Sequence, residues 1–331
     1  MTFYPTFMIP LSASDTRISP LLSGVTWLEV AVLVVAGGGL LIAHPLVVGI
    51  WPWSLAPFNL RFLGALYTAA LLAAFLQSWF GTWAPARTVT TMIFVFTLVV
   101  TACSFVHWER FNPAKVEVWV WFALYIGVCL NAGVHLWWYR RLRPAGSPPD
   151  SWPRAALLAQ ALVLGSYGAA LLVAPEQAAN IWPWKVDTFH AQLYSVAFLT
   201  PAAGALTLMR SATRIDWFTL GITQLAWGLL PIMALVIVDV QLRRVDWTAW
   251  PAWVWVGLFL MTATMGVWML LRAATESVKP IAYRLRMIKR NERCLRPRQP
   301  PARPQFARAP PRQTPHLAGR RAPHRAPAPR H

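Results

Sequence analysis

The chain has 331 residues, of which 56% are hydrophobic and 13% are charged, and its formal net charge is +18. An ordinary soluble domain has about 25% charged residues and shorter apolar runs, so the composition excludes that class. Apolar runs of bilayer length, roughly 20 residues, recur along most of the sequence and predict a helical protein that crosses the lipid bilayer several times.

The net charge is concentrated at the C-terminal end. From Arg272 onward there are 16 Lys or Arg and only two Asp or Glu, so the preceding residues carry a net charge of only +4. A nearly neutral body with a basic tail is not the pattern of a nucleic-acid-binding domain. We therefore expect the tail to bind anionic lipid headgroups, and nucleic acid is not an expected partner.

Eight membrane spans are predicted, each close to the length that crosses about 30 Å of hydrocarbon at 1.5 Å per residue. In chain order they are 25–43, 62–80, 88–106, 118–138, 155–174, 193–209, 217–238 and 252–271. Pro201 in the sixth span and Pro231 in the seventh predict kinks. Around the spans we expect an N-terminal segment (1–24), a basic linker (140–154) and a disordered Pro/Arg-rich tail (273–331).

The tetrapeptide Ile-Trp-Pro-Trp occurs twice, at 50–53 and at 181–184. Because Trp and Pro are rare residue types, two copies about 131 residues apart indicate an internal duplication. Further matches at about 134 residues are Trp119-Val120-Trp121 with Trp253-Val254-Trp255, and Arg110-Phe111-Asn112 with Arg244-Val245-Asp246. The sequence predicts an all-α integral membrane protein with two four-helix repeats (25–139 and 155–272) in the same orientation, a 4+4 parallel tandem repeat.

The distribution of basic residues between loops predicts the orientation. Arg87, the arginines of 140–154, Arg210, Arg214 and the tail all fall on one side. By the positive-inside rule this side is cytoplasmic, so both termini are expected in the cytoplasm of a cell with the protein in its inner (plasma) membrane. Both Trp-Pro-Trp (WPW) loops then lie on the outer face.

The first candidate site consists of the WPW tryptophans: Trp51, Trp53, Trp182 and Trp184. Proline prevents a continuing helix there, and indole rings prefer the membrane interface. Two interpretations remain open. The rings are either anchors that set helix tilt or an aromatic-lined cup for a lipid, a planar ring or a cation, which cation–π attraction would stabilise by roughly 1–2 kcal/mol.

The second candidate site is a weakly basic vestibule on the outer face, suited to an anion. It is formed by Arg61, Arg110, Asn112, Arg244 and Asp246. The charge of Arg61 is not shared between the halves, because Gln192 stands at the corresponding position. The alternative is that these groups make only local hydrogen bonds and ion pairs, such as one between Arg244 and Asp246.

Polar groups inside the spans are costly and form a third set of candidates: Glu29, Asn131, His135 and Gln224. Asn131 and His135 are four residues apart and share a helix face, whereas the second half has Met265 and Met269 there. No catalytic, haem-binding or metal-binding motif is present, so we expect no cofactor, no metal and no enzymatic activity.

The order of motifs in each half resembles a known pattern. A WPW loop is followed by a polar residue about ten positions later, and Arg-Phe-Asn or Arg-Val-Asp then precedes a Trp-Val-Trp span. The pattern is that of an uncharacterised family of bacterial polytopic membrane proteins with duplicated WPW loops, and the resemblance covers most of 20–272. The resemblance implies a membrane location and no known activity.

Two functions follow from these patterns. The first is a non-enzymatic membrane scaffold or component that binds a lipid or a membrane-protein partner through its paired Trp loops. The alternative is a transporter of a small or hydrophobic solute through the cleft between the two repeats, which the duplication permits.

Overall fold

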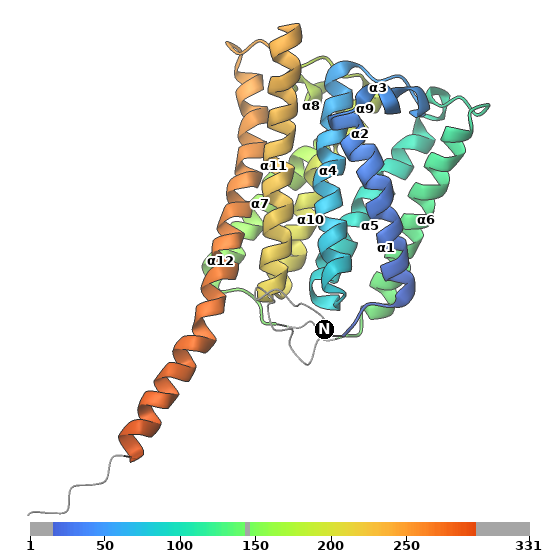
Figure 1. Cartoon of the computed structure of the whole chain (residues 1–331). Helices are drawn as coiled ribbons and strands as arrows, with labels where there is room; N and C mark the ends of the chain where they lie inside the picture. The colour runs from blue at the N-terminus through green and yellow to red at the C-terminus, as the bar shows by residue number, and fades with distance from the viewer. Residues whose placement is uncertain (1–15, 143–145, 296–331) are drawn as a thin grey trace, which may run out of the picture. The chain divides into compact units, whose positions relative to one another are not determined.

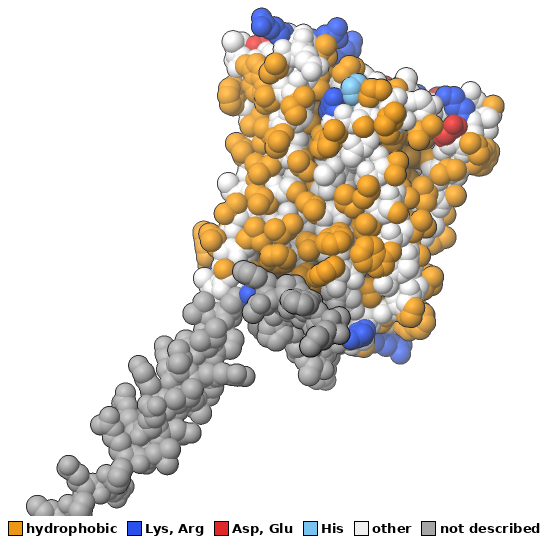
Figure 2. Space-filling view, in the orientation of Figure 1, with side chains coloured by type: hydrophobic (Ala, Val, Ile, Leu, Met, Phe, Trp, Pro, Cys, Tyr) orange, Lys and Arg blue, Asp and Glu red, His pale blue; other side chains and the backbone are white. Residues whose placement is uncertain are grey.

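The computed structural model describes residues 16–142 and 146–295, and the side chains of these residues as far as 275. Within them the chain is helical, without a named strand, and eight helices are long and apolar enough to cross a membrane. Figure 2 shows a flank covered with hydrophobic side chains and charged side chains at its two ends. The predicted all-helical, multi-pass architecture is thereby confirmed.

The first four spans are α1 with its π-helical and α2 continuation, α4, α5 and α6 (Figure 1). Their bounds are α1 Pro20–Leu33, η1 Val34–Gly38, α2 Gly39–Leu41, α3 His44–Val47, η2 Val48–Ile50, α4 Pro57–Phe80, α5 Trp83–Val106, η3 Trp108–Arg110 and α6 Val116–Tyr139. The short helices α3 and η2 lead into the first WPW loop.

The last four spans are α7, α9 with α10, α11 and α12. Their bounds are α7 Ser151–Val173, α8 Pro175–Ala178, η4 Ala179–Ile181, α9 Thr188–Tyr194, α10 Val196–Arg210, α11 Arg214–Leu242 and α12 Trp250–Leu295. Helix α12 continues past 272 into the segment assigned to the tail. The rest of the predicted tail, and with it the site expected for anionic lipid, lies outside the described residues, as do residues 1–15.

Local sequence signals explain several helix ends. Ser19 caps α1 by accepting a hydrogen bond from the Leu22 N–H at 3.0 Å, and Pro20 occupies the first helical position. Thr213 and Asp216 form a capping box at the start of α11. Gly81 ends α4 in the left-handed conformation (φ 62°), which permits the tight turn into α5.

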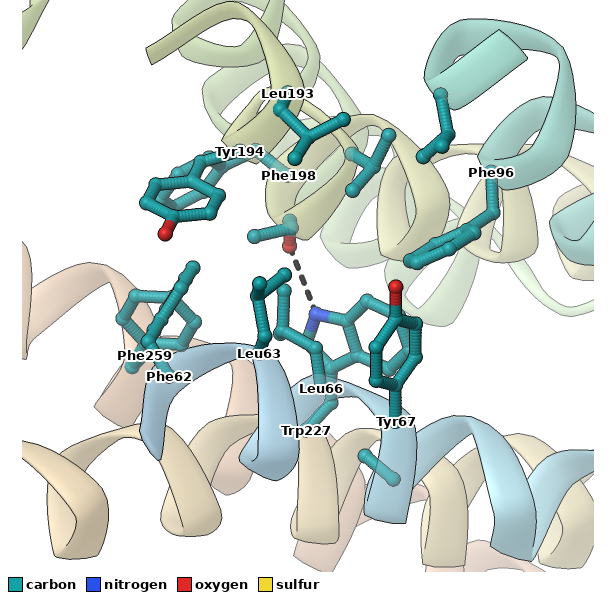
Figure 3. Packing of buried hydrophobic residues seen from close by; sticks show 14 of the residues in the cluster. Phe62, Leu63, Leu66, Tyr67, Phe96, Leu193, Tyr194, Phe198, Trp227 and Phe259 are labelled. Carbon is teal, nitrogen blue, oxygen red and sulfur yellow. Dashed lines mark hydrogen bonds between the residues drawn. The ribbon is translucent and has the colours of Figure 1, made fainter. Parts of the chain in front are cut away.

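The sixth span is interrupted near its proline. Helix α9 ends at Tyr194 and α10 begins at Val196, before Pro201. Because proline has no N–H, the Ala197 carbonyl lacks its helical donor. The Trp227 Nε1–H of α11 donates to that carbonyl instead, at 2.8 Å, and Figure 3 draws this hydrogen bond as a dashed line. Helix α11 runs through Pro231 without a break.

Helix packing links the two halves of the chain. Helix α1 packs along α4 and α7 packs along α10, whereas α4 also packs against α11 and α10 against α5. Phe62, Leu66 and Trp227 fill the space between α4, α10 and α11, and each is at most 2% exposed (Figure 3). The contact between the halves is therefore a packed hydrophobic core.

Candidate functional site

The four WPW tryptophans point into the protein. Trp51, Trp53, Trp182 and Trp184 are between 5% and 9% exposed. By contrast Trp119 and Trp253, at the start of α6 and α12, are 55% and 58% exposed and have the outward position of membrane-interface tryptophans. The WPW rings thus line the interior, and other tryptophans face outward.

Each WPW pair forms an aromatic cluster with a tryptophan of the last helix of its half. In the first half, the Trp121 centroid lies 5.7 Å from Trp51 and 4.9 Å from Trp53. In the second half, Trp255 lies 5.9 Å from Trp182 and 5.6 Å from Trp184. These edge-to-face contacts hold each loop against its own helices.

The two clusters also contact the opposite half reciprocally. Trp53 packs on Phe189 with a centroid distance of 5.3 Å, and Trp184 packs on Phe58 at the same distance. Phe58 and Phe189 occupy corresponding positions, 131 residues apart. In addition, the Trp184 Nε1–H donates to the Asn59 side-chain oxygen at 2.8 Å. The WPW loops therefore join the halves at one end of the bundle, called here the WPW end.

Arg61 does not contribute a free charge to a vestibule. Its guanidinium donates to the Leu41 carbonyl at the end of α2 and contacts His44 Nδ1. At the corresponding position, Gln192 Nε2 donates to the Leu172 carbonyl at 2.8 Å. The two side chains thus donate hydrogen bonds to carbonyls at corresponding helix ends. This shared role is not evident from the sequence, because Arg61 is charged and Gln192 is not.

Asn112 and Asp246 also have matching local roles. Asn112 Oδ1 accepts a hydrogen bond from the Ala114 N–H, and Asp246 Oδ1 accepts from the N–H and the hydroxyl of Thr248. Within the described residues Asp246 makes no ion pair with Arg244, so the expected local pair is absent. The hydrogen bonds from Thr248 hold the pKa of Asp246 below its ordinary value.

Arg110 forms an ion pair with the other half of the chain. Its guanidinium lies 3.4 Å from the Asp187 carboxylate, which caps α9 by accepting from the His190 N–H at 2.9 Å. Partial burial alone would raise the pKa of Asp187. The hydrogen bonds from His190 and the charge of Arg110 outweigh this and lower the pKa below 3.8.

The lowered pKa predicts a pH dependence of stability. A carboxyl whose pKa is depressed in the folded state stabilises the fold above its unfolded pKa and loses this effect as the pH falls through the folded value. We expect wild type to be more stable than Asp187→Asn at neutral pH, and the difference to disappear as the pH falls below 3.8. Thermal unfolding of both proteins between pH 7 and roughly pH 3 measures this. A difference that stays constant over that range would contradict the prediction.

The predicted intramembrane polar residues do not converge on one site. His135 Nε2 lies 2.6 Å from the Ser19 hydroxyl, and its Nδ1 contacts the backbone carbonyl of Asn131. His135 therefore links the start of α1 to α6. Gln224 Oε1 accepts from Gln160 Nε2 at 2.5 Å, between α11 and α7. Both contacts have a structural explanation as links between helices.

An apolar pocket of about 590 Å³ lies between α1, α4, α5, α6 and the first WPW loop, and Thr200 of α10 and Trp227 of α11 complete its wall from the second half. On α6 it extends from Val116 to Val128, a rise of roughly 18 Å along the helix. Leu28 of α1, Val35 of η1 and Val120 of α6 line the pocket and are more than half exposed, so it opens on the flank of the bundle. Its volume is in the range of small-molecule sites.

Aromatic side chains and a few polar atoms form the pocket wall. The aromatic side chains are Trp51, Tyr67, Phe96, Trp121, Tyr125 and Trp227. The hydroxyls of Tyr67 and Tyr125 are 2.8 Å apart and hydrogen-bonded. Trp51 Nε1 and the Thr200 hydroxyl are buried and have no hydrogen-bond partner among the described residues. Buried polar groups are normally satisfied, so these two atoms suit a ligand with polar atoms.

The second half has a larger side chain at one position of the corresponding wall. Tyr167 stands at the position that corresponds to Ala36 of the pocket wall, and its ring packs on Phe198 at 4.7 Å. Phe198 and Phe259 correspond to Tyr67 and Tyr125. The pocket of the first half thus combines a smaller side chain with two additional hydroxyls.

A second depression of about 600 Å³ lies at the WPW end of the second half. Lys185 and Arg244 line it together with Glu176 and Asp187, so charges of both signs are mixed. Of the predicted vestibule, only Arg244 lines it. The mixed charges do not favour an anion.

The chain has no match in comparisons with protein-family models, curated proteins or solved structures. The described residues contain no group of three His, Cys, Asp or Glu side chains that would hold a metal ion. The apolar pocket is therefore the best candidate site. Of the sequence-predicted site residues, Trp51 and Glu29 line it. The other lining residues could have been found from the sequence only by comparing the halves, which differ at Ala36, Tyr67 and Tyr125.

Proposed function

We propose that the protein is a non-enzymatic component of the inner membrane that binds a hydrophobic molecule of the bilayer in the pocket of its first half. The observation that carries the proposal is the pocket itself, which is lined by apolar and aromatic side chains and opens on the hydrophobic flank. A molecule dissolved in the bilayer would enter sideways, between α1 and α6, without leaving the hydrocarbon.

The proposal includes the 4+4 parallel repeat and the cytoplasmic location of both termini. The reciprocal contacts of Trp53 with Phe189 and of Trp184 with Phe58 support a two-fold relation between the halves. The distribution of arginines between the loops supports the orientation. In this arrangement the second half serves as a packed support for the half that binds.

Binding is favoured over the alternative of transport between the repeats. Phe62, Leu66 and Trp227 fill the contact between the halves, and each is almost fully buried. A path through that contact would require these side chains to separate. The buried WPW tryptophans likewise favour an internal role over a docking surface for a membrane-protein partner.

The test introduces at Ala36 the tyrosine that the second half has at the corresponding position, Tyr167. We expect Ala36→Tyr to fill the space that Tyr167 fills in the second half and to abolish binding of a neutral hydrophobe such as hexadecanol. In wild type, hexadecanol at a hundredfold excess over its Kd would stabilise the fold by about 2.7 kcal/mol. Thermal unfolding of the full chain in a neutral maltoside detergent, with and without hexadecanol, measures this.

Ala169→Tyr is the matched control, because Ala169 is an exposed alanine on α7. This variant should keep the full stabilisation by hexadecanol. Equal stabilisation of the Ala36→Tyr variant and of wild type would show that hexadecanol binds elsewhere. No stabilisation of wild type would refute binding in the pocket.

A further inference from the structure

The charge of the pocket distinguishes it from a simple lipid groove. Among its lining residues are two carboxylates, Glu29 of α1 and Glu117 of α6, and no Lys, Arg or His. Glu117 lies in the first turn of α6, and Glu29 lies nine residues after the start of α1, roughly 14 Å along the helix. The pocket thus has a carboxylate near each end and no basic group to neutralise it.

Glu29 has no partner among the residues that the structure describes. Its carboxylate makes no hydrogen bond or ion pair with any described residue, although it lies within a membrane-spanning helix. An ionised carboxylate in such surroundings is costly, so the group either takes up a proton or pairs with a cation. A bound cation would lower that cost, which gives Glu29 a physical reason to face the pocket.

The second half has uncharged residues at the positions that correspond to Glu29 and Glu117. The residue that corresponds to Glu29 is Gln160, an uncharged side chain that pairs with Gln224. Pro251 corresponds to Glu117. Both carboxylates are therefore confined to the half that contains the pocket.

The aromatic wall suits the same kind of ligand. The rings of Trp51, Trp121 and Tyr125 lie close together, with Trp121 centroids 5.7 Å from Trp51 and 4.2 Å from Tyr125. Ring faces attract cations, most strongly where water is excluded. The Thr200 hydroxyl is 2% exposed and has no hydrogen-bond partner in the described part of the chain, so it is available to accept a hydrogen bond from an ammonium group.

We propose that the pocket selects lipophilic cations, such as an amine or a quaternary onium ion that carries aryl or alkyl groups, with Glu29 as the principal counter-ion. This inference rests on the proposed function, because it assigns a substrate class to the same pocket. The aromatic rings hold the apolar groups of the ligand, and Glu117 adds a second negative charge at the other end of the pocket.

Two probes of nearly equal shape and opposite charge test the proposal. Tetraphenylphosphonium is the cation and tetraphenylborate the anion, and titration calorimetry measures each against the full chain in neutral detergent. Heat that persists in the Ala36→Tyr variant is subtracted as partition into the micelle. We expect the cation to bind at least about tenfold more tightly than the anion, as an uncompensated carboxylate requires.

Glu29→Gln is the decisive variant. It should weaken tetraphenylphosphonium binding on the order of tenfold, because a partly buried charge pair is lost, and leave hexadecanol binding unchanged. Glu176→Gln removes an exposed carboxylate outside the pocket and should change neither. If Glu29→Gln fails to fold, the comparison of the two probes on wild type still tests the proposal.

The outcomes separate this inference from the proposed function. Hexadecanol binding without a preference for the cation, or with a cation affinity that Glu29→Gln leaves intact, overturns the cation proposal and leaves hydrophobe binding standing. Absence of binding by hexadecanol and by both ions overturns both proposals. Cation binding that depends on Glu29 supports both.

Discussion

Replacement of Trp255 by alanine is expected to destabilise the fold by about 3–5 kcal/mol, the range for removal of a large buried aromatic side chain. Trp255 is fully buried and contacts Phe259 at 4.4 Å, Trp184 at 5.6 Å and Trp182 at 5.9 Å. Its Nε1 makes no hydrogen bond with a described residue, so the loss is one of packing. Reversible unfolding in mixed micelles gives the free energy of unfolding.

Trp253 provides a matched control two residues away on the same helix. It is 58% exposed, and its Nε1–H donates to the Trp247 carbonyl at 2.8 Å. We expect Trp253→Ala to cost about 1 kcal/mol, the value of one hydrogen bond. Equal effects of the two changes would mean that the WPW cluster does not hold the second half together.

The Gly228→Ala change is expected to destabilise the protein by several kcal/mol, on the order of the cost of overpacking a rigid contact. A Cβ atom on Gly228 would lie 2.4 Å from the Phe259 carbonyl oxygen and 2.5 Å from the Ala263 nitrogen. Both atoms belong to the backbone of α12, so a whole helix would have to move. Gly228 thus allows α11 and α12 to approach closely.

Gly257 is the control for this second change. It is exposed on α12, and a Cβ atom there would meet nothing within 4 Å. In a helix interior, alanine is favoured over glycine by about 1 kcal/mol, so Gly257→Ala should be neutral or stabilising. Thermal unfolding of the two variants should therefore shift in opposite directions. A Gly228→Ala protein as stable as wild type would refute close packing of α11 on α12.

The two halves of the chain differ at positions that line the pocket. Ala36 and the hydroxyls of Tyr67 and Tyr125 distinguish the pocket from a second half in which Tyr167 fills the same space. Elsewhere the halves keep matching contacts, such as the hydrogen bonds of Trp119 to Pro113 and of Trp253 to Trp247. Ala36, Tyr67 and Tyr125 of the pocket wall are among the many positions at which the halves differ.

The predicted vestibule illustrates where sequence patterns were insufficient. The loops predicted on the outer face contain Arg61, Arg110 and Arg244. Because all three are basic, the sequence pattern predicted that they form one anion site. In the structure Arg61 satisfies a helix-end carbonyl and Arg110 pairs with Asp187 of the other half. A hydrogen bond or an ion pair depends on which acceptor lies within about 3–4 Å, and loop sequence alone does not specify that distance.

The sequence by itself determined the helical membrane architecture, the eight spans and the matching WPW loops, because bilayer thickness fixes the length and apolarity of each span. It did not determine which way the tryptophans point, since an indole ring suits both a membrane interface and a protein interior. Only the tertiary structure decided that Trp51 faces a pocket, that Glu29 shares it, and that Tyr167 closes the corresponding space. These features depend on packing between helices far apart in the chain, where the volume of one side chain decides whether a cavity exists.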